Sequence, residues 1–162
     1  QDQAMTQVME LHDSARRRNG ETSVFDSPLR RRFYGDVARR FAERGWLRIF
    51  RLRVDEEPLA AALCFAYGDK VMLYQMGYDL RWGQYGPGYL IGRYLVESAI
   101  ESGASEVDWL RGAHPYKYEW NAQERRIVKL RLGSSPAGGV VAPVTRWLRA
   151  AKHRWKGLRH QH

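Results

Sequence analysis

The chain has 162 residues, 44% of them hydrophobic and 12% aromatic, and it carries a net charge of +9. This length suits one compact domain with a substantial core, and the aromatic content excludes a disordered chain. The single cysteine, Cys64, excludes an internal disulfide and a multi-cysteine metal site, and no apolar run approaches the length of a membrane span. We therefore expect a cytoplasmic protein in a reducing compartment.

Two amphipathic helices are predicted at the start of the chain. Apolar residues recur at helical spacing over residues 3–18, and Asn19-Gly20 ends the pattern. Ser27-Pro28 then supplies an N-cap residue and a first-turn proline for a second helix, which runs to about residue 44. The apolar face predicted for this second helix is formed by Phe33, Val37, Ala38 and Phe41.

Three strands are predicted next, over residues 47–54, 59–67 and 71–78. The second is apolar throughout, which is typical of a central strand that is buried on both faces. Because short turns join the three strands, we expect an antiparallel meander.

A glycine-rich turn over residues 83–88, a helix over 89–102 and a strand over 106–110 follow. The length of this connection suits a right-handed crossover, which would make the new strand parallel to the third one. A last strand over residues 126–132 is expected to pair antiparallel near the edge of the sheet. Residues 1–132 are thus predicted to form an α+β domain, a mixed sheet flanked by helices.

The excess of basic charge belongs to the end of the chain. After Glu124 there are ten basic residues and no acidic one, which leaves 17 basic and 18 acidic residues in the remainder. We predict a Gly/Ser/Pro-rich linker over residues 133–142 and a basic amphipathic helix over 143–162. This helix either packs through Trp147 and Trp155 or binds an acidic partner. That partner would be an anionic membrane surface, which would make the protein membrane-peripheral, or an acyl carrier protein. Nucleic acid is not expected as a partner, because the domain itself is nearly neutral.

The turn before the predicted crossover helix is a candidate anion site. Gly86 and Gly88 allow the backbone to approach a ligand, and Pro87 fixes the chain without needing its missing N–H. The free amides at the start of the helix, between Tyr85 and Tyr89, would face the ligand with the positive end of the helix dipole behind them. A pyrophosphate fits such a site, and a tight turn without a ligand is the alternative.

Asp108 is an acidic residue within an apolar strand, where a carboxylate must be paired or its pKa raised. Its candidate partners are Arg111, Lys117 and Arg93. Two interpretations are open: a buried, hydrogen-bonded Asp108 that orders the following loop, or an Asp108 that takes part in catalysis or substrate binding.

The loop that follows is rich in groups that line clefts. Tyr116 or Tyr118 can protonate a leaving thiolate, and Glu119 or His114 can act as a base. The alternative for Glu119 and His114 is an ordinary surface position. No metal site is expected, because the five histidines of the chain show no ligand spacing.

These segments together resemble a known family of acyltransferases. They are the runs Met76-Gly77-Tyr78-Asp79, Tyr85-Gly86-Pro87-Gly88, Asp108-Trp109-Leu110-Arg111-Gly112 and Tyr116-Lys117-Tyr118-Glu119-Trp120. Over roughly residues 33–132 the chain resembles the GNAT-fold acyltransferases typified by the CelD-like proteins of cellulose biosynthesis, which are related to the FemAB-type aminoacyl transferases. It resembles the C-terminal half of such proteins, so a second GNAT-like domain is expected outside this chain.

The resemblance implies an N- or O-acyltransferase with a role in polysaccharide biosynthesis. Such an enzyme moves an acyl group from acyl-CoA, acetyl-CoA or another acyl carrier to an amine or hydroxyl of a small molecule or saccharide. The resemblance places the cosubstrate between the strands over 71–78 and 106–110. Its pyrophosphate would be held by Tyr85, Gly86, Gly88 and Tyr89.

The resemblance also implies direct transfer, in which a backbone amide of a central strand polarises the thioester carbonyl. Tyr116 or Tyr118 would be the acid, and Asp108 would act beside them. The acceptor side would be formed by Tyr78, Asp79, Arg111, His114, Lys117 and Trp120. The competing hypothesis is a non-catalytic binding module that keeps the GNAT fold, and a measurement of CoA binding discriminates between the two.

Overall fold

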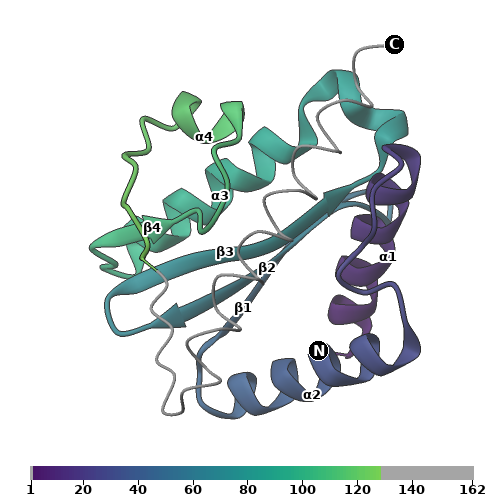
Figure 1. Ribbon diagram of the computed structural model, residues 1–162, viewed down its shortest axis with the longest axis horizontal. Coiled ribbons are helices and arrows are strands. Elements are labelled where there is room, and N and C mark those ends of the chain that lie inside the picture. Colours follow the sequence, from purple (N-terminus) through teal and green to yellow (C-terminus); the bar gives the residue numbers. More distant parts are fainter. Residues whose placement is uncertain (1, 129–162) are drawn as a thin grey trace, which may run out of the picture. The chain divides into compact units, whose positions relative to one another are not determined.

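The computed structural model describes residues 2–128, and those up to Ala122 belong to one compact unit. The helices of this unit are α1 (Asp2–Arg18), α2 (Pro28–Glu43), α3 (Pro87–Glu101), α4 (Pro115–Glu119) and a 3-10 helix, η1 (Leu80–Tyr85) (Figure 1). Its strands are β1 (Leu47–Val54), β2 (Glu57–Tyr67), β3 (Lys70–Tyr78) and β4 (Glu106–Asp108). Among the described helices, none has the length and apolar character that a membrane crossing requires. The linker predicted over 133–142 and the helix predicted over 143–162 lie outside the described residues.

The four strands form one sheet in the order β1-β2-β3-β4. The first three strands are antiparallel neighbours, and β4 runs parallel to β3. The helix α3 makes the connection between these two parallel strands. The predicted meander, crossover helix and parallel strand are confirmed, and the protein has the α+β architecture expected from its sequence.

The strand β4 ends at Asp108 and not at residue 110 as predicted. Leu110 has a φ of 55°, and its N–H donates to Asp108 Oδ1 at 2.7 Å. The chain therefore turns where an extended strand was expected. The last predicted strand, over 126–132, is wrong for its first three residues, which carry no regular structure, and its remainder lies outside the described residues.

The central strand β2 separates two hydrophobic cores. Ala61 and Leu63 belong to the core under α1 and α2, whereas Ala60, Ala62 and Cys64 belong to the core under α3. Figure 1 shows the corresponding layers, with α1 and α2 on one side of the sheet and α3 on the other. The burial of all five side chains confirms that β2 is a two-sided central strand.

Of the apolar face predicted for α2, only Ala38 is buried in the core, and Phe33 lies at the surface. The side chain of Phe33 is 58% exposed, whereas the neighbouring Tyr34 packs against the core under α1 and α2. The ring of Tyr34 meets Phe25 edge-on at 5.0 Å, and its hydroxyl lies 2.6 Å from the hydroxyl of Tyr74 on β3. These contacts turn Tyr34 toward the sheet and leave Phe33 at the surface.

The helix α1 lies directly on β3 at Gly77. A Cβ atom at this position would lie 2.3 Å from the backbone nitrogen of His12 and 2.5 Å from the carbonyl carbon of Leu11. No real side chain fits at such distances, so the absence of a Cβ sets how closely the helix approaches the strand. This contact fixes α1 at the end of β3 that leads into the candidate site.

Candidate active site

The strand β3 has an open edge over its second half. Its pairing with β4 covers only the pairs Lys70–Glu106, Val71–Val107 and Met72–Asp108, although β3 continues to Tyr78. Among the described residues no strand pairs with this edge over residues 73–78. Backbone N–H and C=O groups along such an edge can hydrogen-bond an extended ligand as an additional strand would.

A β-bulge in the pairing of β2 with β3 lies just beyond the point where β4 stops pairing with β3. On β2, the neighbouring residues Leu63 and Cys64 pair with Gln75 and Leu73 of β3, so Tyr74 is the extra residue. A bulge bends the strand and increases its local twist. Tyr74 lies on the sheet face under α1 and α2, whereas Leu73 before it and Met76 two residues after it pack under α3. This bulge was not visible in the sequence pattern.

The open edge of β3 leads through a short 3-10 helix to the first turn of α3. Asp79 caps η1 by accepting the N–H of Arg81 at 2.9 Å, and the Arg81 guanidinium contacts the same carboxylate. The hydrogen bond from Arg81 is the main cause that holds the pKa of Asp79 below its usual range. Asp79 is therefore an anion engaged within the turn, at the end of β3.

The start of α3 has the geometry predicted for an anion site. Gly86 has a φ of 61° and provides no side-chain cap, and Pro87 is the first helical residue. The first-turn amides thus lack the N-cap side chain that usually satisfies them, at the positive end of the helix dipole. Tyr85 and Tyr89, both largely exposed, flank this turn.

Gly88 packs on β3, so the helix start and the strand are in contact. A Cβ at Gly88 would lie 3.5 Å from Met76 and 3.7 Å from the ring of Tyr78, which is ordinary van der Waals distance. The ring of Tyr78 therefore lies at the base of the turn, on the face covered by α3. The structure therefore places Tyr78 at the predicted carrier site, the turn expected to hold the pyrophosphate, and not at the loop that follows β4.

An aromatic stack fixes the loop after β4 on the start of α3. The ring of Trp120 stacks on Tyr89 at 4.7 Å and on Trp109 at 5.6 Å. Gly92 makes room for it, because a Cβ there would lie 3.3 Å from Trp120 Cζ2. Trp120 thus joins the loop to the predicted carrier site, and Trp109, which the sequence did not single out, shares this role.

Lys117 is the internal support of the same loop. Its side chain is buried, and its Nζ donates to the carbonyl oxygens of Trp109 at 2.7 Å, Leu110 at 3.1 Å and Arg111 at 2.9 Å. Burial lowers the pKa of Lys117, and the Asp108 carboxylate opposes this shift. The ammonium group is directed at the loop backbone, so the structure gives Lys117 a supporting position in place of a substrate-facing one.

Asp108 is half-buried at the end of β4, and its Oδ1 accepts the N–H of Leu110. This geometry corresponds to the interpretation in which Asp108 orders the loop. Val107 and Trp109 pack under α3, so by strand alternation Asp108 lies on the opposite face of the sheet. Arg111, which follows the turn, is exposed.

Tyr116, one of the two candidate acids, lies on the short helix α4. Its half-buried ring meets Trp109 edge-on at 6.0 Å and stacks on the exposed His114 at 6.1 Å. Burial raises the pKa of Tyr116, while the charge of Arg16 opposes this shift. Tyr118 is more exposed and lies on the same short helix. Within residues 2–128 no group of His, Cys, Asp or Glu side chains is arranged to hold a metal ion.

The comparisons with known proteins find a matching family model. Residues 1–118 match the model of a protein family described as "Acetyltransferase (GNAT) domain", which is well over half of the chain. The comparison with curated proteins finds no match. The mixed sheet with its parallel pair and its flanking helices is consistent with the fold of the matched family.

Proposed function

Because the chain belongs to the acetyltransferase (GNAT) domain family, we propose that it transfers an acyl group from acyl-CoA to an amine or hydroxyl. The single observation that carries this proposal is the open edge of β3 beyond Met72, which leads directly to the uncapped start of α3. An extended pantetheine arm can hydrogen-bond to the strand edge, and a pyrophosphate suits the helix start. Tyr85, Gly86, Gly88 and Tyr89 are the residues proposed to hold it.

The proposed reaction is a direct transfer. The lone pair of the acceptor nitrogen or oxygen attacks the thioester carbonyl carbon, and backbone amides of β3 stabilise the developing oxyanion. The C–S bond then breaks, and the thiolate takes a proton from Tyr116 or Tyr118. The proton released by the acceptor passes to a base, for which Glu119 and His114 are the candidates. The half-buried position of Tyr116 between Trp109 and His114 supports it as the acid.

The acceptor we propose is a small molecule or saccharide, in line with the resemblance to CelD-like and FemAB-type transferases. Asp108, Arg111 and His114 are the groups proposed to orient it, because they border the loop that carries Tyr116. The basic segment beyond residue 128 is proposed to contact an acyl carrier protein or an anionic membrane surface. Its eight basic residues without acidic neighbours support an acidic partner.

A charge introduced at the helix start tests the carrier site. In Gly88→Asp the added Cβ has room, and a carboxylate in the first turn of α3 favours the helix, so the fold should keep its stability. The same carboxylate repels a pyrophosphate. We expect calorimetry to show at least a tenfold loss of CoA affinity, whereas the affinity for pantetheine, which lacks the phosphates, stays the same.

Gly88→Asn is the matched control, since it has nearly the same shape without the charge, and the further loss of CoA affinity in Gly88→Asp beyond that of Gly88→Asn is the effect of the charge. Release of free thiol from acetyl-CoA in the presence of amines then reports the transfer itself. If the unaltered protein shows no binding at millimolar CoA, the enzyme assignment fails and the non-catalytic binding module replaces it.

A further inference from the structure

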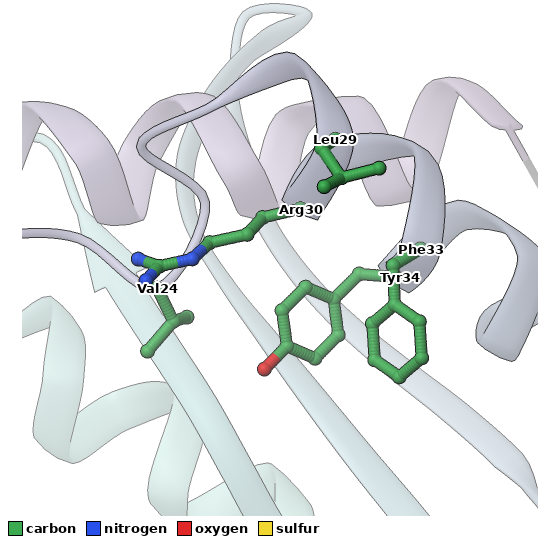
Figure 2. Close-up of a pocket in the computed structure, with 5 residues that line it drawn as sticks. All are labelled: Val24, Leu29, Arg30, Phe33 and Tyr34. Atoms are coloured by element: carbon green, nitrogen blue, oxygen red, sulfur yellow. The ribbon is translucent and has the colours of Figure 1, made fainter.

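A pocket of about 650 Å³ opens beside the first turns of α2, away from the start of α3. It is lined by Val24, Leu29, Arg30, Phe33 and Tyr34 (Figure 2). This volume falls within the range of small-molecule sites. The lining is apolar except for Arg30, and the guanidinium of Arg30 is already paired with Asp26 at 2.8 Å. The pocket therefore offers an uncharged ligand a site without an unpaired charge.

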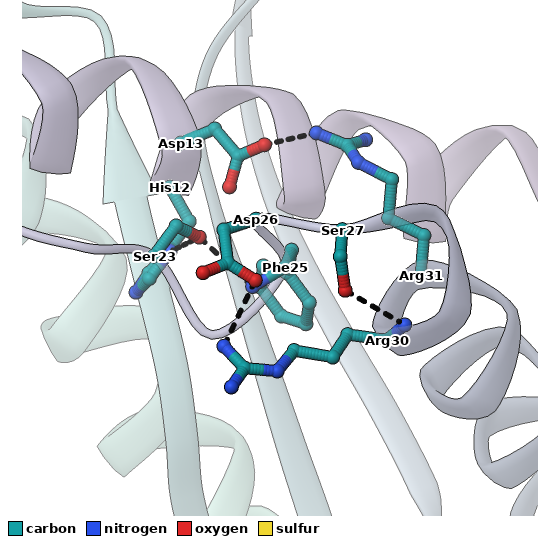
Figure 3. A network of polar contacts seen from close by, with 8 residues as sticks. All are labelled: His12, Asp13, Ser23, Phe25, Asp26, Ser27, Arg30 and Arg31. Carbon is teal, nitrogen blue, oxygen red and sulfur yellow. Dashed lines mark hydrogen bonds and ion pairs between the residues drawn. The ribbon is translucent and has the colours of Figure 1, made fainter.

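The wall formed by Val24 is held in place by buried neighbours. The hydroxyl of Ser23 lies 2.9 Å from Nδ1 of His12 and accepts the N–H of Phe25 at 3.0 Å (Figure 3). Phe25 is completely buried and packs edge-on against His12 and Tyr34. Because both neighbours of Val24 are fixed, this wall of the pocket is formed before a ligand arrives, which lowers the entropic cost of binding.

The outer wall exposes an unusual amount of apolar surface. The side chain of Leu29 is 79% exposed and that of Phe33 is 58% exposed, one helical turn apart on α2. Contiguous apolar surface next to a cavity is typical of a site that is covered when its ligand is bound. An apolar ligand in the pocket would bury both side chains.

The pocket is connected to the strand that carries the candidate active site. Tyr34 in its lining is hydrogen-bonded at 2.6 Å to Tyr74, the extra residue of the bulge in β3. Asp108 lies on the same face of the sheet as Tyr74, as strand alternation shows. The pocket, the bulge and the end of β4 thus share one face, and the open edge of β3 begins at the bulge.

We propose that this pocket receives the apolar end of the acceptor, so the acceptor is an amphipathic amine or alcohol with an aliphatic chain. This inference rests on the proposed acyl transfer. The nucleophilic end of the acceptor reaches the thioester at the edge of β3, while its chain lies between Val24 and Phe33. The neutral, apolar lining selects for chain length and not for charge.

A series of n-alkylamines from ethylamine to octylamine tests the proposal, with acetyl-CoA as donor and thiol release as the readout. The basicity of the amine hardly changes along the series, so chain burial is the main variable. We expect kcat/KM to rise by about threefold to fourfold per added methylene until the pocket is filled. Phe33→Asp, which places a carboxylate at the pocket, should abolish this dependence.

Ile100→Asp is the matched control, because Ile100 is 70% exposed on α3 and receives the same change of charge away from the pocket. It should keep the full dependence on chain length. A dependence that is flat in the unaltered protein, or that Ile100→Asp removes as well, overturns the proposal.

Binding of 1-octanol, followed by NMR at the methyl groups of Val24, separates the pocket from the reaction. Saturable shifts that Phe33→Asp removes support the pocket. If these shifts occur but no amine is acylated, the proposed function fails and the pocket stands. Absence of any shift overturns the pocket. Sedimentation that shows a dimer dissolved by Phe33→Asp also overturns it, because the apolar surface would then belong to a second copy of the chain.

Discussion

At the scale of single residues, Gly77 decides how α1 packs on β3. A glycine in a strand is usually a weakness, and replacing it with alanine is usually favourable. Here the new methyl group would lie 2.3 Å from the backbone of His12, so the helix must move. We expect Gly77→Ala to lower the free energy of unfolding by about 1–3 kcal/mol, measured by urea denaturation.

Gly35→Ala provides the matched control, because Gly35 lies within α2 and nothing is found within 4 Å of its added Cβ. This variant should stabilise the protein by about 0.5–1 kcal/mol, since alanine is the better helix former. Equal stability of the two variants would show that the contact between His12 and Gly77 is not rigid.

Lys117 makes a second prediction at this scale. Lys117→Met keeps the length of the side chain but leaves the carbonyl groups of Trp109, Leu110 and Arg111 without their shared donor. We expect a loss of at least about 1.5 kcal/mol in the free energy of unfolding, together with a weaker near-ultraviolet signal from the stacked tryptophans. Circular dichroism during urea unfolding measures both.

Lys70→Met serves as the comparison for Lys117, because Lys70 forms a partly exposed ion pair with Glu106. Such a pair contributes at most about 1 kcal/mol. If both lysine variants lose the same small amount, the three hydrogen bonds of Lys117 do not hold the loop.

At the scale of elements, the sequence was sufficient to predict the ends of an element where one or both of its faces are buried. The strands β1, β2 and β3 and the helix α3 lie within two residues of their predicted ends, because hydrophobic periodicity reports burial directly. The short β4 shows the limit of this signal. A side-chain hydrogen bond from the Leu110 N–H to Asp108 ends the strand, and an apolar pattern cannot reveal it.

The candidate site was predictable to the same extent. The glycine turn at the start of α3 was expected because Gly86 and Pro87 have strong backbone preferences of their own. The burial of Lys117 was not, since a lysine between aromatic residues of a loop is normally exposed. The pocket beside Phe33 was also missed, because it depends on the contact of Tyr34 with Tyr74, which are 40 residues apart.

At the scale of the whole molecule, the two layers of helices meet the sheet at different chemical surfaces. The core under α3 is apolar, whereas α1 and α2 are joined by a buried polar cluster of His12, Asp13 and Ser23 (Figure 3). Asp13 pairs with Arg31 of α2, and Ser23 anchors the connecting loop. Protonation of His12 in this cluster is therefore coupled to the folding of the unit.

His12 makes the stability of the protein dependent on pH. Burial is the main cause that lowers its pKa below 6.5, with a further contribution from the charge of Arg16, while Asp13 and Glu21 oppose the shift. As the pH falls through 6.5, the unfolded chain therefore takes up a proton before the folded one does. The stabilising effect of the neutral His12 is fully present above pH 6.5. Below that pH the free energy of unfolding declines, by up to about 1.4 kcal/mol per pH unit.

The free energy of unfolding in urea, measured between pH 7.5 and pH 5.5, checks this dependence. We expect a decline toward pH 5.5 in the unaltered protein and a flatter profile in His12→Gln, which cannot take up the proton. His114→Gln, which alters an exposed histidine of the loop after β4, should leave the decline unchanged. A decline of the same size in His12→Gln would assign the pH dependence to another group. Stability that rises toward pH 5.5 would mean that His12 gains an acidic partner on folding and is not held neutral by burial.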